Sequence, residues 1–71
     1  MAIELSNEEK IKVVEQHMKA VAYAKYNAEL SLAQENVLYS PNTETVVSLT
    51  KQIQDSIAQQ QILQDEIDSL S

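Results

Sequence analysis

Apolar residues recur in steps of three and four along two long stretches of the chain, one on each side of Ser40-Pro41-Asn42-Thr43. This spacing places apolar side chains on one face of an α-helix. The first stretch follows a capping-box sequence, in which the Ser6 hydroxyl accepts from the N–H of Glu9 and the Glu9 carboxylate accepts from the N–H of Ser6. We predict a first helix over about residues 7–39, a turn over 40–43 and a second helix over about 42–69.

Pro41 accounts for the turn. The residue before a proline is disfavoured in the α region, so the first helix is expected to end by Tyr39. Proline also suits the first position of a helix, which makes Ser40 the expected N-cap of the second helix, with Asn42 or Thr43 as the alternative.

The two apolar patterns match each other when the chain folds back on itself. In an antiparallel hairpin, facing residues have numbers that add to a constant, and a sum of 81 gives a set of core layers. These layers are Ile11/Leu70, Val14/Ile67, Met18/Leu63, Val21/Gln60, Lys25/Ser56, Ala28/Ile53, Leu32/Leu49 and Glu35/Val46. Polar Lys25 then meets polar Ser56, and small Ala28 meets large Ile53. Because spacing and chemistry agree, we predict an all-α fold, a two-helix antiparallel hairpin with coiled-coil-like packing, as a single domain over residues 1–71.

Several polar residues fall in or beside this core. They are His17, Lys25, Glu35, Ser56, Gln60 and Glu66. A polar residue at a core position usually specifies register or partner choice at some cost in stability, although such residues also serve as functional groups inside bundles. We expect Lys25 to extend towards Asp55 at the edge of the core, and His17 to hydrogen-bond Glu66 between the helices.

Composition removes several classes of function. The 71 residues include no glycine and no cysteine, which argues against β-hairpins, phosphate-binding loops, disulfides and thiolate metal sites. Eleven acidic residues against five lysines give a formal charge of −6, and arginine is absent. An acidic surface repels nucleic acid and anionic membranes, so neither is an expected partner.

Catalytic chemistry has no evident place in the sequence, and we expect neither enzymatic activity nor a cofactor. His17 is the only histidine, and Val14 precedes it by three residues where the helical motif of dimetal carboxylate bundles needs glutamate. Two copies of His17 and Glu66 meeting in a symmetric dimer would be the one conceivable metal site. The opening residues 1–5 are too short and acidic for a signal peptide, so a cytoplasmic location is expected.

The first helix carries a second apolar stripe beside the core. Its members are Val13, His17, Ala20, Ala24, Asn27, Leu30, Val37 and Leu38. A helix with one neighbour needs only one stripe, so a second stripe indicates a second neighbour. Tyr23 and Tyr26 lie on the side away from the second helix, and tyrosine is enriched at protein interfaces. The candidate interface residues are Ala20, Tyr23, Ala24, Tyr26, Asn27 and Leu30.

These patterns favour a non-enzymatic interaction or assembly module. It is expected to self-associate through the first helix, doubling the hairpin into a four-helix bundle, and to bind another protein. One alternative is an acidic inhibitor or decoy that occupies a basic nucleic-acid-binding surface. The other is a bundle that binds a small ligand or metal through His17 and Glu66.

Overall fold

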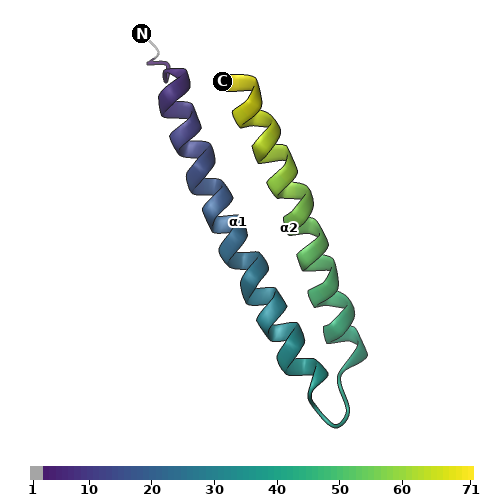
Figure 1. Ribbon diagram of the computed structural model, residues 1–71. Coiled ribbons are helices and arrows are strands. Elements are labelled where there is room, and N and C mark those ends of the chain that lie inside the picture. The colour runs from purple at the N-terminus through teal and green to yellow at the C-terminus, as the bar shows by residue number, and fades with distance from the viewer. Residues whose placement is uncertain (1–2) are drawn as a thin grey trace.

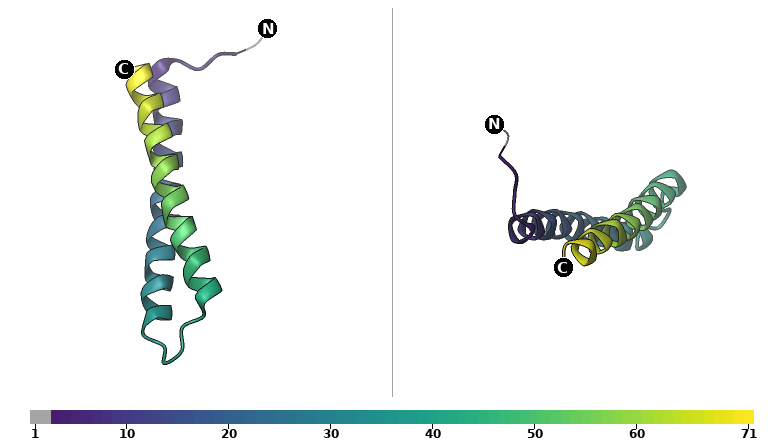
Figure 2. Two further views of the ribbon diagram at one scale, coloured as in Figure 1. Left: turned by 90° about the vertical axis from the view of Figure 1, so that its right-hand side faces the viewer. Right: turned by 90° about the horizontal axis from the view of Figure 1, so that it is seen from above.

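Two long helices and one turn make up the fold. The computed structural model describes residues 3–71, with α1 spanning Asn7–Asn36 and α2 spanning Thr43–Leu70 (Figure 1). The helices run antiparallel along a rod with extents of 59 × 19 × 16 Å, so the start of α1 and the end of α2 lie at the same end. Residues 3–6 extend away from the rod at that end (Figure 2). The predicted all-α antiparallel hairpin is confirmed.

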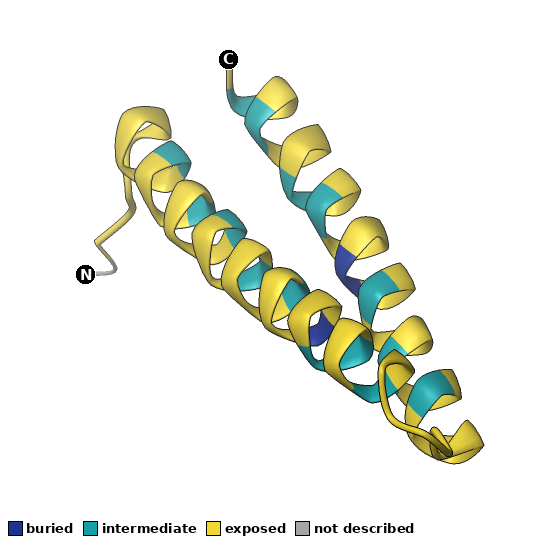
Figure 3. Cartoon of the chain, turned by 60° about the horizontal axis from the view of Figure 1, so that its bottom comes forward, coloured by how far each residue is buried: buried dark blue, intermediate teal, exposed yellow. Residues whose placement is uncertain are grey.

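The contact between the helices, which we call the seam, consists of the predicted core layers. All sixteen residues of the layers from Ile11/Leu70 to Glu35/Val46 are buried or half-buried. Among the other residues that the structure describes, only Ser31 is half-buried, and the rest are exposed. Figure 3 shows the buried and half-buried positions following the facing sides of the two helices. The hydrophobic pattern of the sequence therefore predicts correctly which face of each helix contacts the other helix.

The most buried positions of the seam carry small side chains. Ala28 on α1 is 4% exposed and Ser56 on α2 is 8% exposed, and they are the only two described residues that count as buried. Small side chains shorten the distance at which two helix axes can pack. The Ser56 hydroxyl donates to the carbonyl of Gln52 at 2.9 Å, so its burial leaves no hydrogen-bonding group without a partner.

Capping groups define where the helices begin. The Ser6 hydroxyl accepts from the N–H of Glu9 and the Glu9 carboxylate accepts from the N–H of Ser6, each at 3.1 Å, as the capping-box sequence predicts. The side-chain amide of Asn7 donates to the carbonyl of Leu70 at 3.4 Å. This bond links the two helices at the end of the rod opposite the turn.

The turn begins earlier than predicted, and α2 uses the alternative N-cap Asn42. α1 ends at Asn36, three residues before Tyr39, and Asn42 rather than Ser40 caps α2 by accepting from the N–H of Thr45 at 3.1 Å. The N–H of Asn42 donates to the Glu35 carboxylate at 2.7 Å. Because this carboxylate lies at the positive end of α2, both the hydrogen bond and the helix dipole favour a longer turn that starts after Asn36.

The longer turn takes three apolar residues out of the helix. Val37, Leu38 and Tyr39 were expected in the last turn of the first helix, but they lie in the turn between the helices and are exposed. None of the described residues has a positive φ, so the chain reverses without the conformation that glycine supplies.

Candidate functional site

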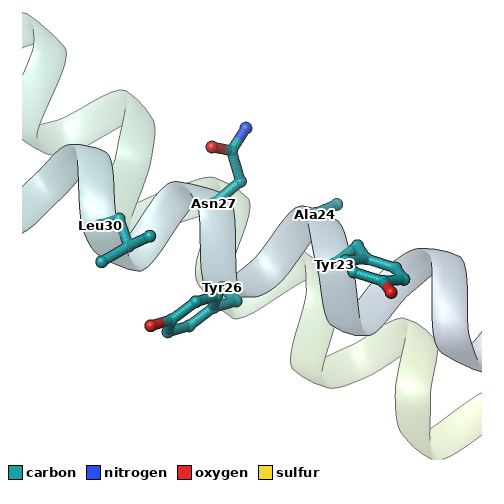
Figure 4. A pocket seen from close by; sticks show the side chains of 5 residues that line it. All are labelled: Tyr23, Ala24, Tyr26, Asn27 and Leu30. Atoms are coloured by element: carbon teal, nitrogen blue, oxygen red, sulfur yellow. The ribbon is translucent and has the colours of Figure 1, made fainter.

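The side of α1 that faces away from α2 carries an exposed aromatic and aliphatic surface, which we call the outer face. Its residues are Lys19, Ala22, Tyr23, Ala24, Tyr26, Asn27 and Leu30. Tyr23 is 67% exposed, Tyr26 61% and Leu30 45%. Figure 4 shows five of these side chains, from Tyr23 to Leu30, on α1 with α2 behind it. Large apolar side chains this exposed, and this close together, are typical of a surface that contacts another molecule.

A shallow hollow lies among five of these residues. Tyr23, Tyr26, Asn27 and Leu30 surround it, with Ala24 at its edge (Figure 4). The first four occupy positions i, i+3, i+4 and i+7 of the helix. Four residues with this spacing form the hole that accepts a side chain from a facing helix in coiled-coil packing. The shape therefore matches what a second helix needs.

A second hollow lies one helical turn closer to the N-terminus. Lys19, Ala22, Tyr23 and Tyr26 surround it, and they have the same i, i+3, i+4, i+7 spacing. The two tyrosines belong to both hollows. The outer face thus alternates large side chains with small gaps along about three turns of helix, an arrangement suited to interdigitation.

The sequence identified most of this surface. Tyr23, Ala24, Tyr26, Asn27 and Leu30 line the first hollow together, whereas Ala20 is exposed but lines neither hollow. Lys19 and Ala22 were not among the predicted interface residues. Their signal was available in the sequence, because Lys19, Tyr23, Tyr26 and Leu30 are spaced by four, three and four, which is a heptad pattern.

His17 and Glu66 do not form the predicted hydrogen bond. Both are exposed, and within residues 3–71 neither side chain takes part in a hydrogen bond or an ion pair. A flanking pair of this kind gains only ~0–1 kcal/mol in water, too little to hold two mobile side chains in one geometry. His17 instead borders a hollow beside the seam, with Val21 from α1 and with Gln59, Ile62 and Leu63 from α2.

The other polar residues of the predicted set lie in the seam. Lys25, Glu35 and Gln60 are half-buried, and Ser56 is buried. The ammonium of Lys25 does not turn towards Asp55, because it pairs with Glu29 one turn along α1 at 3.4 Å. Glu35 accepts from the N–H of Asn42, so its carboxylate holds the turn. Lys25, Glu35 and Ser56 thus each find a partner on their own helix or in the turn.

Charged residues elsewhere are mostly separate from one another. Lys25–Glu29 is the only ion pair in the described part of the chain. At the end of α2 the carboxylates of Asp65 and Asp68 accept from the side-chain amides of Gln61 and Gln64, at 2.9 and 3.0 Å. Those acidic groups are therefore satisfied along α2 and make no ion pair with lysines of α1.

One carboxyl group has a shifted pKa. The backbone N–H of Ser6, and to a smaller extent its hydroxyl, hold the pKa of Glu9 below its ordinary value because they stabilise the ionised form. Over residues 3–71, no three histidine, aspartate or glutamate side chains gather closely enough to hold a metal ion. In the same part of the chain, neither helix has a stretch apolar enough to cross a lipid bilayer.

The chain was compared with protein families, curated proteins and solved structures. No family model matches the chain, and neither the curated proteins nor the solved structures compared with it show a match.

Proposed function

We propose that the hairpin is a non-enzymatic assembly module that pairs with a second copy of itself through the outer face of α1. The observation that carries this proposal is the pair of hollows that share Tyr23 and Tyr26. A surface that holds both the large side chains and the gaps that receive them is complementary to its own copy. A symmetric dimer uses one such patch on both subunits.

The exposed area of the hairpin supports pairing. Its accessible surface is 5736 Å², whereas a compact monomer of this mass has about 4,450 Å². The difference is about 1,300 Å², part of it in the extended residues 3–6 and the rest on helices that each touch one neighbour. A stable interface buries about 800 Å² on each partner, so a dimer would cover much of this excess.

The turn offers a separate surface for a different protein. Val37, Leu38 and Tyr39 are consecutive, apolar and exposed at the end of the rod, away from the outer face. We assign to this segment the second part of the proposed function, which is contact with another protein. The centres of the two hollows lie about three to four helical turns from this segment.

Sedimentation equilibrium from micromolar to millimolar concentration tests self-association. The wild-type hairpin is expected to reach twice its 8.0 kDa chain mass, and a Tyr23→Ala/Tyr26→Ala variant is expected to dissociate at least tenfold more readily. Tyrosine is enriched among the central interface residues whose truncation costs about 2 kcal/mol or more, and about 1.4 kcal/mol corresponds to tenfold in affinity.

Ile62→Ala is the matched control, because Ile62 is as exposed as Tyr23 but lies on α2 outside the outer face. It should leave the dissociation constant unchanged. Circular dichroism of each variant establishes that the helices remain. A folded wild-type chain that sediments as a monomer at every concentration would exclude the proposal, and equal weakening by all three alanines would exclude the outer face.

A further inference from the structure

We infer that the two copies pair with their α1 helices antiparallel, so that the two turns lie at opposite ends of the assembly. This inference rests on the proposed self-association and specifies its geometry. It concerns an arrangement of four helices in which the two α1 helices form the centre and each α2 lies on the outside.

The shape of the outer face fits this arrangement in one register. The first hollow is centred between residues 26 and 27 and the second between residues 22 and 23, as their lining residues show. When facing residue numbers add to 49, Tyr23 of one copy enters the first hollow of the other, and Tyr26 enters the second hollow. Both tyrosines are thus accommodated at once, which is the interlocking that knobs-into-holes packing requires.

Parallel pairing would also place the tyrosines in hollows, so charge has to decide. In a parallel pair each residue of α1 faces its own counterpart, and Lys12 and Lys19 would meet the same lysines of the second copy. In the antiparallel register Lys19 faces Leu30 of the second copy. A lysine stem can cover an apolar neighbour while its ammonium stays in water, so this contact carries no repulsion.

The distribution of charge along the rod favours the same orientation. The half of the hairpin with the termini, residues 1–23 and 58–71, has seven acidic residues and three lysines, and the half with the turn has four acidic residues and two lysines. Parallel pairing would place the two more acidic halves together, whereas antiparallel pairing places each beside the less acidic half. Antiparallel α1 helices also oppose their dipoles.

The orientation predicts the distances between equivalent residues of the two copies. These distances can be measured with labels on introduced cysteines, because the chain has no cysteine of its own. At 1.5 Å per residue, a register with a sum of 49 separates the two Asn36 positions by about 35 Å and the two Glu8 positions by about 50 Å along the axis. Parallel pairing would leave either pair about one interhelical distance apart, near 10 Å between axes. Both residues are exposed and lie near opposite ends of α1.

The experiment places a nitroxide label on Asn36→Cys and, separately, on Glu8→Cys, and measures label-to-label distances by pulsed dipolar electron paramagnetic resonance. Sedimentation of the same samples establishes which are dimers. Dimers with distances near 35 Å and 50 Å support the inference. Dimers in which both distances are short, or in which the Glu8 distance is the shorter, overturn it while self-association stands. Folded samples that are monomers overturn both proposals, and a second label site keeps the test valid if one substitution perturbs folding.

Discussion

Ala28 provides the most direct test of how the two helices pack. It is the most buried residue described, at 4% exposed, and it lies in the layer with Ile53. Ala28→Leu adds three carbon atoms where the helices have no room for them. We expect the variant to remain helical but to lose stability, because the helices must separate or the leucine must take a strained rotamer.

The expected loss follows from the burial of this position. Overpacking a close-packed site costs about 1–3 kcal/mol. A chain of this length has roughly 4–10 kcal/mol of total stability, so the change is a large fraction of it. For a domain of this size, each kcal/mol shifts Tm by about 4–8 °C, which predicts a decrease of about 5–20 °C. Ala58→Leu, on the exposed side of α2, should change stability by less than about 0.5 kcal/mol.

A second substitution tests which residue Ala28 faces. Ile53→Ala alone removes a half-buried side chain and should cost about 1–2.5 kcal/mol, below the range for full burial. Combined with Ala28→Leu, it exchanges the large and small members of one layer. The double variant should therefore be more stable than the sum of the single effects by about 1 kcal/mol. Leu63→Ala, three layers away, should add to Ala28→Leu without such coupling.

Urea and thermal unfolding followed by circular dichroism measure these differences, at one protein concentration because association changes apparent stability. The reasoning is refuted if Ala28→Leu unfolds like the wild type. Coupling of Ala28→Leu to Leu63→Ala instead of Ile53→Ala would show that the helices pack in a different register.

Two further predictions concern the ends of the helices. Glu35→Ala removes the carboxylate that accepts from the N–H of Asn42, and it should lower the free energy of unfolding by about 0.5–1.5 kcal/mol in urea titrations. Glu9 has a lowered pKa in the folded chain, so its contribution is complete above the pKa of the unfolded chain and is lost as pH falls through the folded value. Stability measured against pH should therefore decrease on the acidic side more steeply than in Glu9→Gln.

Each of these predictions has its own control. Glu35→Gln keeps an oxygen acceptor at the same place and should retain most of the stability that Glu35→Ala loses; equal losses would point to the charge and not to the hydrogen bond. Glu9→Gln can still cap the helix but does not titrate. Stability curves that run parallel for wild type and Glu9→Gln through the acidic range would contradict the assigned pKa shift.

The seam was predictable from sequence because a helical pattern repeats over many turns. Once two such helices are antiparallel, their register is described by one number, which is the sum of the residue numbers that face each other. The match of Lys25 with Ser56 and of Ala28 with Ile53 selects the register with a sum of 81. One polar residue in the core does not change the predicted register, because a shift of one residue would misplace all eight layers at once.

The end of α1 was less predictable because the competing energies are small and depend on the partner helix. Val37, Leu38 and Tyr39 continue the apolar spacing, but the Asn42 cap and its bond to Glu35 favour ending the helix at Asn36. Each such contact contributes about 1 kcal/mol, similar to what a frayed last turn loses. The hollows of the outer face could not be located from the sequence, because the spacing of residues does not show which gaps between side chains remain open.

The single turn also orders the formation of the layers. The Glu35/Val46 layer closes a loop of about ten residues and the Ile11/Leu70 layer one of about sixty, a difference of about 1.5 kcal/mol in loop-closure entropy when each forms alone. Folding is therefore cheapest when it starts at the turn and proceeds along the rod. Fraying starts at the other end, where the Asn7–Leu70 hydrogen bond is the last link. A protein fused to either terminus would thus be attached at the least stable end of the hairpin.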